Sequence, residues 1–197
     1  MIEVTITVYD VHMNPSSSGD QLLDPQFILE KAGVHEGALV ADFGCGAAAH
    51  FVFPASTMVG KHGKVFAVDV LPAVLHKITQ RAREENKGNI IPVWSDLEVF
   101  QAAKDIPDNT LDVGMLINTL FQSKNKEAMM RESARMVKRG GRLLVVEWKL
   151  AVAPFGPAAN QRVGPDAVRA LAHGLQLEES YSFEAGSYHY GILFKKI

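Results

Sequence analysis

The sequence predicts an α/β fold built on a mostly parallel sheet. Along the 197 residues, five short apolar runs rich in β-branched residues alternate with longer segments of helical periodicity. Continuous apolar runs of this kind are typical of parallel strands that are covered on both faces. Two further strand-like segments near the C-terminus are joined only by residues 184–187, so they must pair as an antiparallel hairpin. One strand of the sheet is therefore expected to be reversed.

The predicted elements follow one another as strand and helix in turn. The strands are expected at Ala38–Phe43, Lys64–Val68, Ile90–Trp94, Thr110–Ile117, Arg142–Trp148, Leu177–Phe183 and Tyr188–Lys195. Apolar spacings of three and four, with proline or glycine at the ends, place helices at Asp24–Ala32, Phe51–Val59, Pro72–Asn86, Lys124–Lys138 and Gly164–Gly174. The alternating segment Ile2–Tyr9 is a further expected strand, which could pair with another chain and leaves a homodimer open.

The composition indicates one globular unit. The chain is 47% apolar and carries 20 basic against 22 acidic residues, a net charge of −2. Balanced charge and high apolar content exclude a disordered chain and argue against a protein that coats duplex nucleic acid. We expect residues 1–23 to form an N-terminal strand and flexible lid segment, and residues 24–197 to form the functional domain.

Cysteine content and hydropathy indicate the cellular compartment in which the protein is expected. Cys45 is the one cysteine, which excludes an internal disulfide and favours a reducing compartment. The histidines show no metal-ligand spacing, so we expect no metal site. Glu147 and Lys149 interrupt the longest apolar run, so no stretch reaches the roughly 18–20 apolar residues of a membrane helix. We therefore expect a cytoplasmic protein that does not enter a membrane.

A glycine turn and two carboxylates predict a ligand cleft. Gly44 and Gly46 follow the first strand, where glycine permits a sharp turn and close approach of a ligand to the backbone. Asp69 ends the second strand, where a carboxylate can accept hydrogen bonds from two ribose hydroxyls. Asp96 follows the third strand and could accept from an exocyclic amine, or could merely cap a turn. Because the carboxyl ends of parallel strands meet at one edge, these side chains are expected to line one cleft.

Two classes of nucleotide satisfy this pattern. Gly44-x-Gly46-x-x-Ala49, with Asp69 twenty positions further on, fits the dinucleotide fingerprint of an NAD(P)-dependent oxidoreductase. Asp42, two positions before the first glycine, would repel a pyrophosphate but suits a ligand that carries an ammonium and a sulfonium group. S-adenosylmethionine carries both of these groups and no phosphate. The electrostatics therefore favour S-adenosylmethionine.

Five segments in their order resemble the class I S-adenosylmethionine-dependent methyltransferases. These segments are Val40–Gly46, Gly63–Asp69, Ser95–Leu97, Asp112–Asn118 and Val137–Leu143. The resemblance spans the chain from about Asp24 to the C-terminus. It implies a Rossmann-like three-layer sandwich with a seven-stranded sheet of order 3-2-1-4-5-7-6, strand 7 antiparallel. It also implies an enzyme that transfers a methyl group and leaves S-adenosyl-L-homocysteine.

The resemblance also implies where the cofactor binds. Gly44 and Gly46 would face the methionine moiety, Asp69 would hold the ribose, and Asn118 would lie near the amino-acid end. Asp96 and Leu97 would hold the adenine. The full expected set is Asp42, Gly44, Cys45, Gly46, Ala48, Asp69, Val70, Asp96, Leu97 and Asn118. The chain departs from the family pattern at Ala48, where a third glycine is usual.

The sequence restricts the class of methyl acceptor mainly through the motifs that it lacks. Ile117–Phe121 differs from the motif of enzymes that methylate nucleic-acid amino groups, so a small, partly apolar metabolite is the expected acceptor and a protein side chain the second choice. His189, with Tyr188 behind it, is the candidate general base near the cofactor edge, and ordinary aromatic packing is the alternative. Because no strong base is visible, a non-catalytic S-adenosylmethionine-binding partner protein also stays open.

Overall fold

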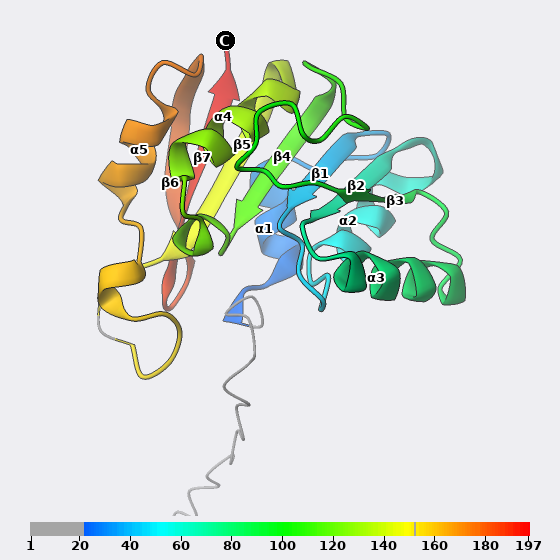
Figure 1. The fold of residues 1–197 in the computed structure, drawn as a ribbon, viewed down its shortest axis with the longest axis horizontal. Helices are drawn as coiled ribbons and strands as arrows, with labels where there is room; N and C mark the ends of the chain where they lie inside the picture. Colours follow the sequence, from blue (N-terminus) through cyan, green and yellow to red (C-terminus); the bar gives the residue numbers. More distant parts are fainter. Residues whose placement is uncertain (1–21, 152) are drawn as a thin grey trace, which may run out of the picture.

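The protein is built on one seven-stranded sheet of order β3-β2-β1-β4-β5-β7-β6 (Figure 1). The computed structural model describes residues 22–151 and 153–197. Adjacent strands within the series β3-β2-β1-β4-β5 are parallel. β7 is antiparallel to both of its neighbours, β5 and β6. The strands are β1 (Leu39–Phe43), β2 (Lys64–Asp69), β3 (Ile90–Trp94), β4 (Leu111–Ile117), β5 (Val137–Trp148), β6 (Leu177–Gly186) and β7 (His189–Lys196). This order and the reversed strand confirm the predicted fold class.

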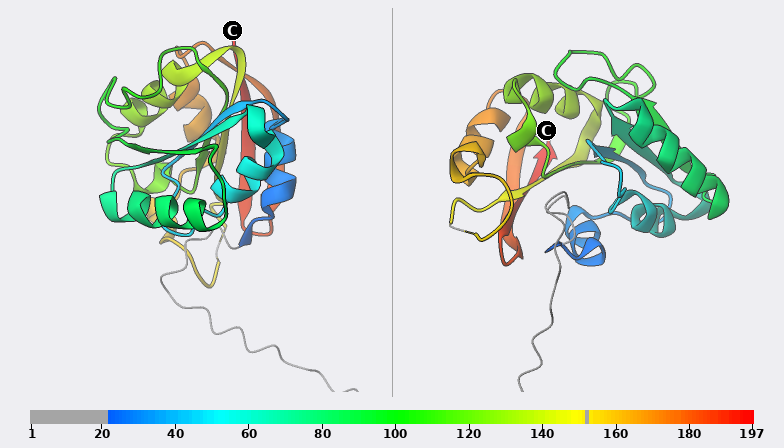
Figure 2. Two further views of the ribbon diagram at one scale, coloured as in Figure 1. Left: turned by 90° about the vertical axis from the view of Figure 1, so that its right-hand side faces the viewer. Right: turned by 60° about the horizontal axis from the view of Figure 1, so that its bottom comes forward.

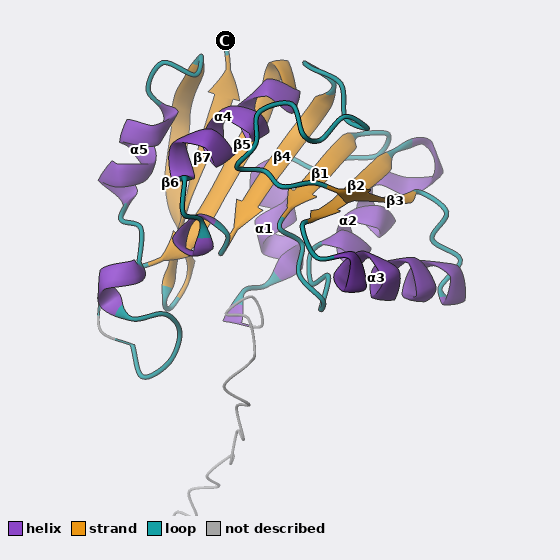
Figure 3. Cartoon of the chain, viewed as in Figure 1, coloured by secondary structure: helices purple, strands orange, loops and turns teal. Residues whose placement is uncertain are grey.

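Helices cover both faces of the sheet and complete three layers (Figures 2 and 3). Buried side chains of α1, α2 and α3 pack on one face, and those of α4 and α5 pack on the other. The helices are α1 (Pro25–Ala32), α2 (Val52–Val59), α3 (Pro72–Glu84), α4 (Lys126–Met136) and α5 (Pro165–Ala172), with short 3-10 helices η2 (Gly60–His62), η3 (Leu120–Gln122) and η4 (Ala159–Gln161). All five predicted helices are present, within one or two residues at each end.

The carboxyl ends of the parallel strands meet at one edge of the sheet, the lower edge in Figure 1, which we call the carboxyl edge. There β1 leads to α2, β2 to α3 and β4 to η3, and the turn between β6 and β7 reaches the same edge. Since β1 lies between β2 and β4, the chain connections diverge to either side of it. Open α/β sheets bind ligands at this kind of divergence point.

Two strand boundaries differ from the prediction by more than one residue, the start of β5 and the end of β6. β5 begins at Val137 and not at Arg142, because Val137 pairs with Leu111 before the register shifts. β6 continues to Gly186, so the hairpin turn is shorter than 184–187 and Tyr188 lies in the turn and not in a strand. The expected strand Ile2–Tyr9, and most of the expected 1–23 segment, lie outside the described residues.

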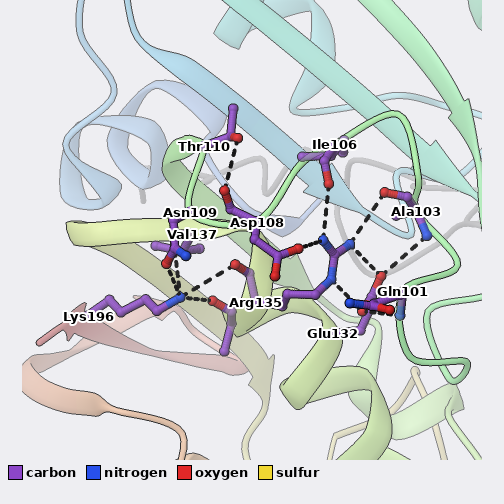
Figure 4. A network of polar contacts seen from close by, with 11 residues as sticks. Gln101, Ala103, Ile106, Asp108, Asn109, Thr110, Glu132, Arg135, Val137 and Lys196 are labelled. Carbon is purple, nitrogen blue, oxygen red and sulfur yellow. Dashed lines mark hydrogen bonds and ion pairs between the residues drawn. The ribbon is translucent and has the colours of Figure 1, made fainter.

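A buried ion pair fixes the loop between β3 and β4 to helix α4 (Figure 4). The Glu132 carboxylate, which is fully buried, accepts from the backbone N–H groups of Gln101 and Ala103. Arg135 donates to Glu132 at 2.7 Å and to Asp108 at 2.5 Å. Beside this pair, Lys196 at the end of β7 donates to the backbone carbonyls of Ala134 and Val137, both at 2.8 Å, and so caps the end of α4. These contacts add to the packing of the buried side chains of the loop, Leu97, Ala103 and Ile106.

We expect Arg135→Met to destabilise the fold strongly, because it leaves the Glu132 carboxylate buried without its cation. The free energy of unfolding should fall by about 3–5 kcal/mol, as for other buried pairs that lose one partner. The measurement is urea unfolding followed by circular dichroism. The matched control is Arg83→Met on the exposed face of α3, which should change stability by less than about 1 kcal/mol. A similar small loss for Arg135→Met would contradict this account of the loop.

Candidate functional site

The glycine turn after β1 is held between the ends of β2 and β4. Gly44 and Gly46 have φ angles of 77° and 61°, the left-handed region that glycine adopts without strain. The backbone N–H of Gly44 donates to the carbonyl of Val68 at 2.8 Å. On the other side, a Cβ on Gly44 would lie 2.6 Å from Cγ2 of Thr119, so a larger residue would not fit. A Cβ on Gly46 would meet nothing within 4 Å, so the backbone there faces open space.

Asp69 connects the end of β2 to this turn. One carboxylate oxygen, Oδ2, accepts from the N–H of Gly46 at 3.0 Å, and Oδ1 accepts from the N–H of Leu71 at 2.9 Å. A carboxylate can accept about four hydrogen bonds, so these two leave capacity for ribose hydroxyls. The side chain is 92% buried, since its relative exposure is 8%. Asp69 therefore shapes the backbone of the candidate site in addition to the ligand role predicted for it.

Two carboxylates, those of Asp42 and Asp69, lie beneath the turn next to the thiol of Cys45. Asp42 lies within β1 and Cys45 in the turn, and both are buried. Burial, followed by the charges of Asp42 and Asp69, raises the pKa of the Cys45 thiol. The two carboxylates therefore lie within electrostatic reach of Cys45, as the common cleft requires. A thiol with a raised pKa is inert, so Cys45 is a small neighbour of the site and not a nucleophile.

Ala48, at the position where a third glycine is usual, does not have a left-handed backbone. Ala48 is exposed, and its carbonyl accepts from Arg81 at 3.4 Å. The residue with left-handed backbone is the next one, Ala49, with a φ of 48°. The turn thus accommodates a methyl group at Ala49, which is buried, and Ala48 stands at the rim.

The end of β3 lies beside the end of β2. Ser95 N–H donates to the carbonyl of Asp69 at 3.2 Å, and Asp96 Oδ1 accepts from the N–H of Glu98 at 2.9 Å, which is the turn-capping role considered as the alternative. Val70 is 49% exposed at the rim, whereas the Leu97 side chain is buried in the core. The hydroxyl of Ser95 is buried and has no hydrogen-bond partner in the described parts of the chain. Sequence reasoning passed over Ser95, although its place at a strand end was a usable signal.

The ends of β4 and β5 close the other side. Asn118, with a φ of 53°, is buried, and its N–H donates to the carbonyl of Val146 at 2.9 Å. The hydroxyl of Thr119 donates to the carbonyl of Phe43 at 2.9 Å. Glu147 is fully buried, accepts from the N–H of Phe121 at 3.2 Å, and has its pKa raised to about 8 by burial. The sequence signal for Glu147 was a single carboxylate in an apolar strand, read only as an interruption of hydropathy.

The two candidate catalytic residues lie further along the carboxyl edge. His189 begins β7 directly opposite Trp148 of β5, and it is fully buried. Burial, and then the charges of Lys149 and Arg162, lower the pKa of His189 to about 4. Tyr188 lies in the hairpin turn, with its ring centroid 4.8 Å from that of Phe155. The structure places both residues near the cofactor edge, and their role stays a prediction.

These residues fit a positively charged nucleoside. The glycine turn offers open space beside a buried carboxylate with spare acceptor capacity, and Ser95 offers a buried hydroxyl for a polar ligand group. Two buried carboxylates at the turn disfavour a diphosphate. Among the described residues, no group of three or more His, Cys, Asp or Glu is placed to hold a metal ion. In that same part of the chain, every helix is too short or too polar to cross a membrane.

The sheet order, with the glycine turn and the acidic strand ends at its carboxyl edge, is the fold of the class I S-adenosylmethionine-dependent methyltransferases. The chain belongs to the ubiE/COQ5 methyltransferase family, whose model matches residues 3–163. The ubiquinone/menaquinone biosynthesis C-methyltransferase UbiE of Salmonella arizonae is 32% identical over 154 residues, or 76% of this chain. The homologue of Salmonella dublin matches equally well. The chain spans 59% of the length of these curated relatives.

Solved structures show the same fold. A SAM-dependent methyltransferase from Aquifex aeolicus has a TM-score of 0.82 and 24% identity, covering 93% of this chain and 95% of that chain. The PH0226 protein from Pyrococcus horikoshii has a TM-score of 0.70 and 17% identity, covering 96% and 97%. The [4+2]-cyclase SpnF has a TM-score of 0.74 and 14% identity, covering 94% and 85%. Because the name of SpnF states a cyclase, the fold alone does not fix the reaction.

We expect Asp69→Asn to weaken binding of S-adenosylhomocysteine by about 10- to 100-fold, because hydrogen bonds to a charged acceptor contribute roughly 1.5–3 kcal/mol. Asparagine preserves the size of the side chain and one acceptor for the turn, which alanine would remove. Isothermal titration calorimetry measures the affinity, and far-UV circular dichroism checks the fold. Asp105→Asn, at an exposed position in the β3–β4 loop, is the control and should bind normally. Equal affinities for the two variants would refute the role of Asp69.

Glu147 should give the fold a specific pH dependence. Its pKa is raised from 4.5 to about 8, so between these values the folded protein keeps a proton that the unfolded chain has lost. The free energy of unfolding therefore falls as the pH rises through this interval. His189 acts in the opposite direction but only between pH 4 and 6.5, because its pKa is lowered from 6.5 to about 4.

The interval from pH 6.5 to pH 8 thus isolates Glu147 from His189. There the native protein should lose about 2 kcal/mol of stability, and Glu147→Gln, which cannot ionise, should lose almost none. Urea unfolding at the two pH values measures the difference. Parallel pH profiles for the two proteins would show that Glu147 keeps an ordinary pKa.

Proposed function

We propose that this protein transfers the methyl group of S-adenosylmethionine to a ring carbon of a small quinone-type acceptor in its reduced, hydroquinone form. The observation that carries this proposal is the family match over residues 3–163, which includes the carboxyl ends of β1 to β5. The curated relatives in this family are named as C-methyltransferases of ubiquinone and menaquinone biosynthesis. Family membership favours a methyltransferase over a non-catalytic partner and over an oxidoreductase.

The reaction is a displacement at carbon. When bound, S-adenosylmethionine supplies an electrophilic methyl group on a positively charged sulfur. Transfer to a ring carbon forms one C–C bond, breaks one C–S bond and releases the proton of that carbon. The products are the methylated hydroquinone, S-adenosylhomocysteine and a proton. The hydroquinone is the nucleophilic form because its hydroxyl groups donate electron density to the ring, whereas the carbonyls of the quinone withdraw it.

The protein contributes mainly alignment and exclusion of water. Asp42 and Asp69 attract the positively charged nucleoside, but the sulfur loses its charge during transfer, so this attraction does not itself favour the transition state. Gly44, Gly46 and Thr119 instead fix the backbone in one conformation, which holds the reacting groups in line. The loss of charge on sulfur also weakens the hold on the product, which favours its release.

His189 enters this scheme as a neutral imidazole. With a pKa of about 4 it is uncharged at neutral pH and is a weak proton acceptor. His189 is therefore better suited to a hydrogen bond with an oxygen of the acceptor than to the role of general base. The cytoplasmic location expected from the sequence belongs to the same proposal, as does a small molecule in preference to a protein side chain.

The test is methylation by the purified full chain of a short-chain hydroquinone, compared with the same compound oxidised to the quinone. We expect the hydroquinone, held reduced by dithionite, to gain a methyl group on carbon, detected by mass spectrometry and NMR. The quinone should be unreactive because its ring is electron-poor. Methylation of a peptide side chain or an amine instead, with no product from either redox form, would contradict the proposed acceptor class.

A further inference from the structure

Two buried aromatic rings at the carboxyl edge carry nitrogen atoms without hydrogen-bond partners. Trp148 and His189 are paired across β5 and β7, with ring centroids 4.2 Å apart and exposures of 1% and 0%. Within residues 22–151 and 153–197, neither Nε1 of Trp148 nor either ring nitrogen of His189 has a partner. Native proteins rarely leave buried polar groups unpaired, and such groups require an explanation. We call these two residues the Trp148–His189 pair.

Aromatic and cationic groups surround the Trp148–His189 pair. Phe155 meets Trp148 edge to face at 6.3 Å and Tyr188 at 4.8 Å. Gly156 lies directly on the indole, since a Cβ there would be 2.6 Å from Cη2 of Trp148. The guanidinium of Arg162 lies 5.4 Å from the indole centroid. The surroundings are thus suited to a flat ring.

The segment that covers the pair is held by few contacts. Residues 153–161 are all exposed or half-buried, and Phe155 and Gly156 connect them to the core through their contacts with Trp148. Arg162 holds the segment by donating to the carbonyls of Pro157 and Phe155, at 3.0 and 3.4 Å, and to those of Lys149 and Ala151, at 3.0 and 2.5 Å. Segments with few buried apolar contacts open at low free-energy cost. A ring can therefore reach Trp148 by displacing Phe155 and Gly156 without disturbing the sheet.

The Trp148–His189 pair also lies close to the glycine turn on the sheet. It is at the same carboxyl edge as the glycine turn, with Trp148 two strands and His189 three strands from β1 (Figure 1). Adjacent strands lie about 4.8 Å apart, so the pair is roughly 10–14 Å along the edge from that turn. Trp148 directly follows Glu147, whose carboxyl group holds Phe121 in the segment after β4. The pair is thus beside the candidate cofactor site and outside it.

We propose that the Trp148–His189 pair recognises the ring oxygen of the acceptor, with the indole N–H donating to that oxygen and the imidazole accepting from its hydroxyl group. This inference rests on the proposed function. A hydroxyl group both donates and accepts, so it satisfies two of the three unpartnered nitrogens at once. The imidazole stays neutral in its buried place, which preserves one nitrogen as an acceptor. The pair is thereby a specificity site for phenolic rings, because a ring without the hydroxyl would leave the nitrogens unpaired.

The first test observes binding directly. The chain has two tryptophans, and Trp94 is 57% exposed, so Trp94→Phe leaves the buried Trp148 as the single indole. A short-chain hydroquinone, held reduced, is titrated into this variant saturated with S-adenosylhomocysteine, and indole emission is recorded. We expect saturable quenching, because the N–H of the buried indole then donates to the hydroxyl group of the hydroquinone. Emission that stays unchanged at hydroquinone concentrations that saturate the native enzyme would overturn the proposal.

The second test separates recognition from cofactor binding. Trp148→Phe and His189→Phe preserve aromatic packing and should raise KM for the hydroquinone by about 10- to 100-fold, the effect of a lost hydrogen bond with a buried partner. Affinity for S-adenosylhomocysteine should be unchanged in calorimetry. His189→Gln retains a donor and an acceptor and should recover most of the loss. His173→Phe, at an exposed position after α5, is the matched control and should behave as the native protein.

The outcomes distinguish the two proposals. A native protein that methylates no hydroquinone refutes the proposed function, and the inference with it. A native protein that methylates hydroquinone, with unchanged KM in folded Trp148→Phe and His189→Phe, refutes the inference alone. If both variants fail to fold by circular dichroism, the quenching experiment and His189→Gln decide, because both retain the native indole.

Discussion

The hydrogen bond from the Gly46 N–H to the Asp69 carboxylate is the contact on which the site depends. It crosses from the end of β2 to the turn after β1, while the hydroxyl of Thr119 reaches the carbonyl of Phe43 from the end of β4. The turn is therefore held from both neighbouring strands, at the place where the chain connections diverge. These contacts hold the two left-handed glycines in one conformation, so the backbone does not need to rearrange when a ligand binds.

Charge is distributed unevenly along the carboxyl edge. Over β1 and β2 the buried groups are the carboxyl groups of Asp42 and Asp69. Over β5 and β7 burial shifts two pKa values in opposite directions, to about 8 for Glu147 and to about 4 for His189, and leaves both groups neutral at pH 7. One half of the edge thus suits a cation and the other an uncharged aromatic ring. The proposed methyl transfer from a sulfonium to a hydroquinone joins two such reactants, so the same burial that forms the core would also separate their binding places.

Elements fixed by local periodicity were predictable, and contacts between strand ends were not. The five helices and the strand order follow from apolar spacing and from a resemblance in ordered segments. The roles of Thr119 and Glu147 arise from contacts with Phe43 and Phe121, which are distant in sequence, and no spacing indicates them. The Leu97 side chain packs in the core, and its expected place at the adenine stays a prediction. The third glycine position of the family corresponds to Ala48, whereas the left-handed backbone is at Ala49, since a one-residue shift in a loop leaves no trace in composition.

The position of β7 between β5 and β6 has a consequence for biosynthesis. During translation β6 emerges before β7, yet it has no place in the sheet until β7 has inserted beside β5. Until then the nascent chain exposes a long unpaired strand edge, which invites pairing with other chains. Lys196, whose ammonium group closes the end of α4, is delivered by the same late strand. Completion of this half of the molecule therefore waits on β7, and a chain cut short before β7 would leave the edge of β5 unpaired and prone to association with other chains.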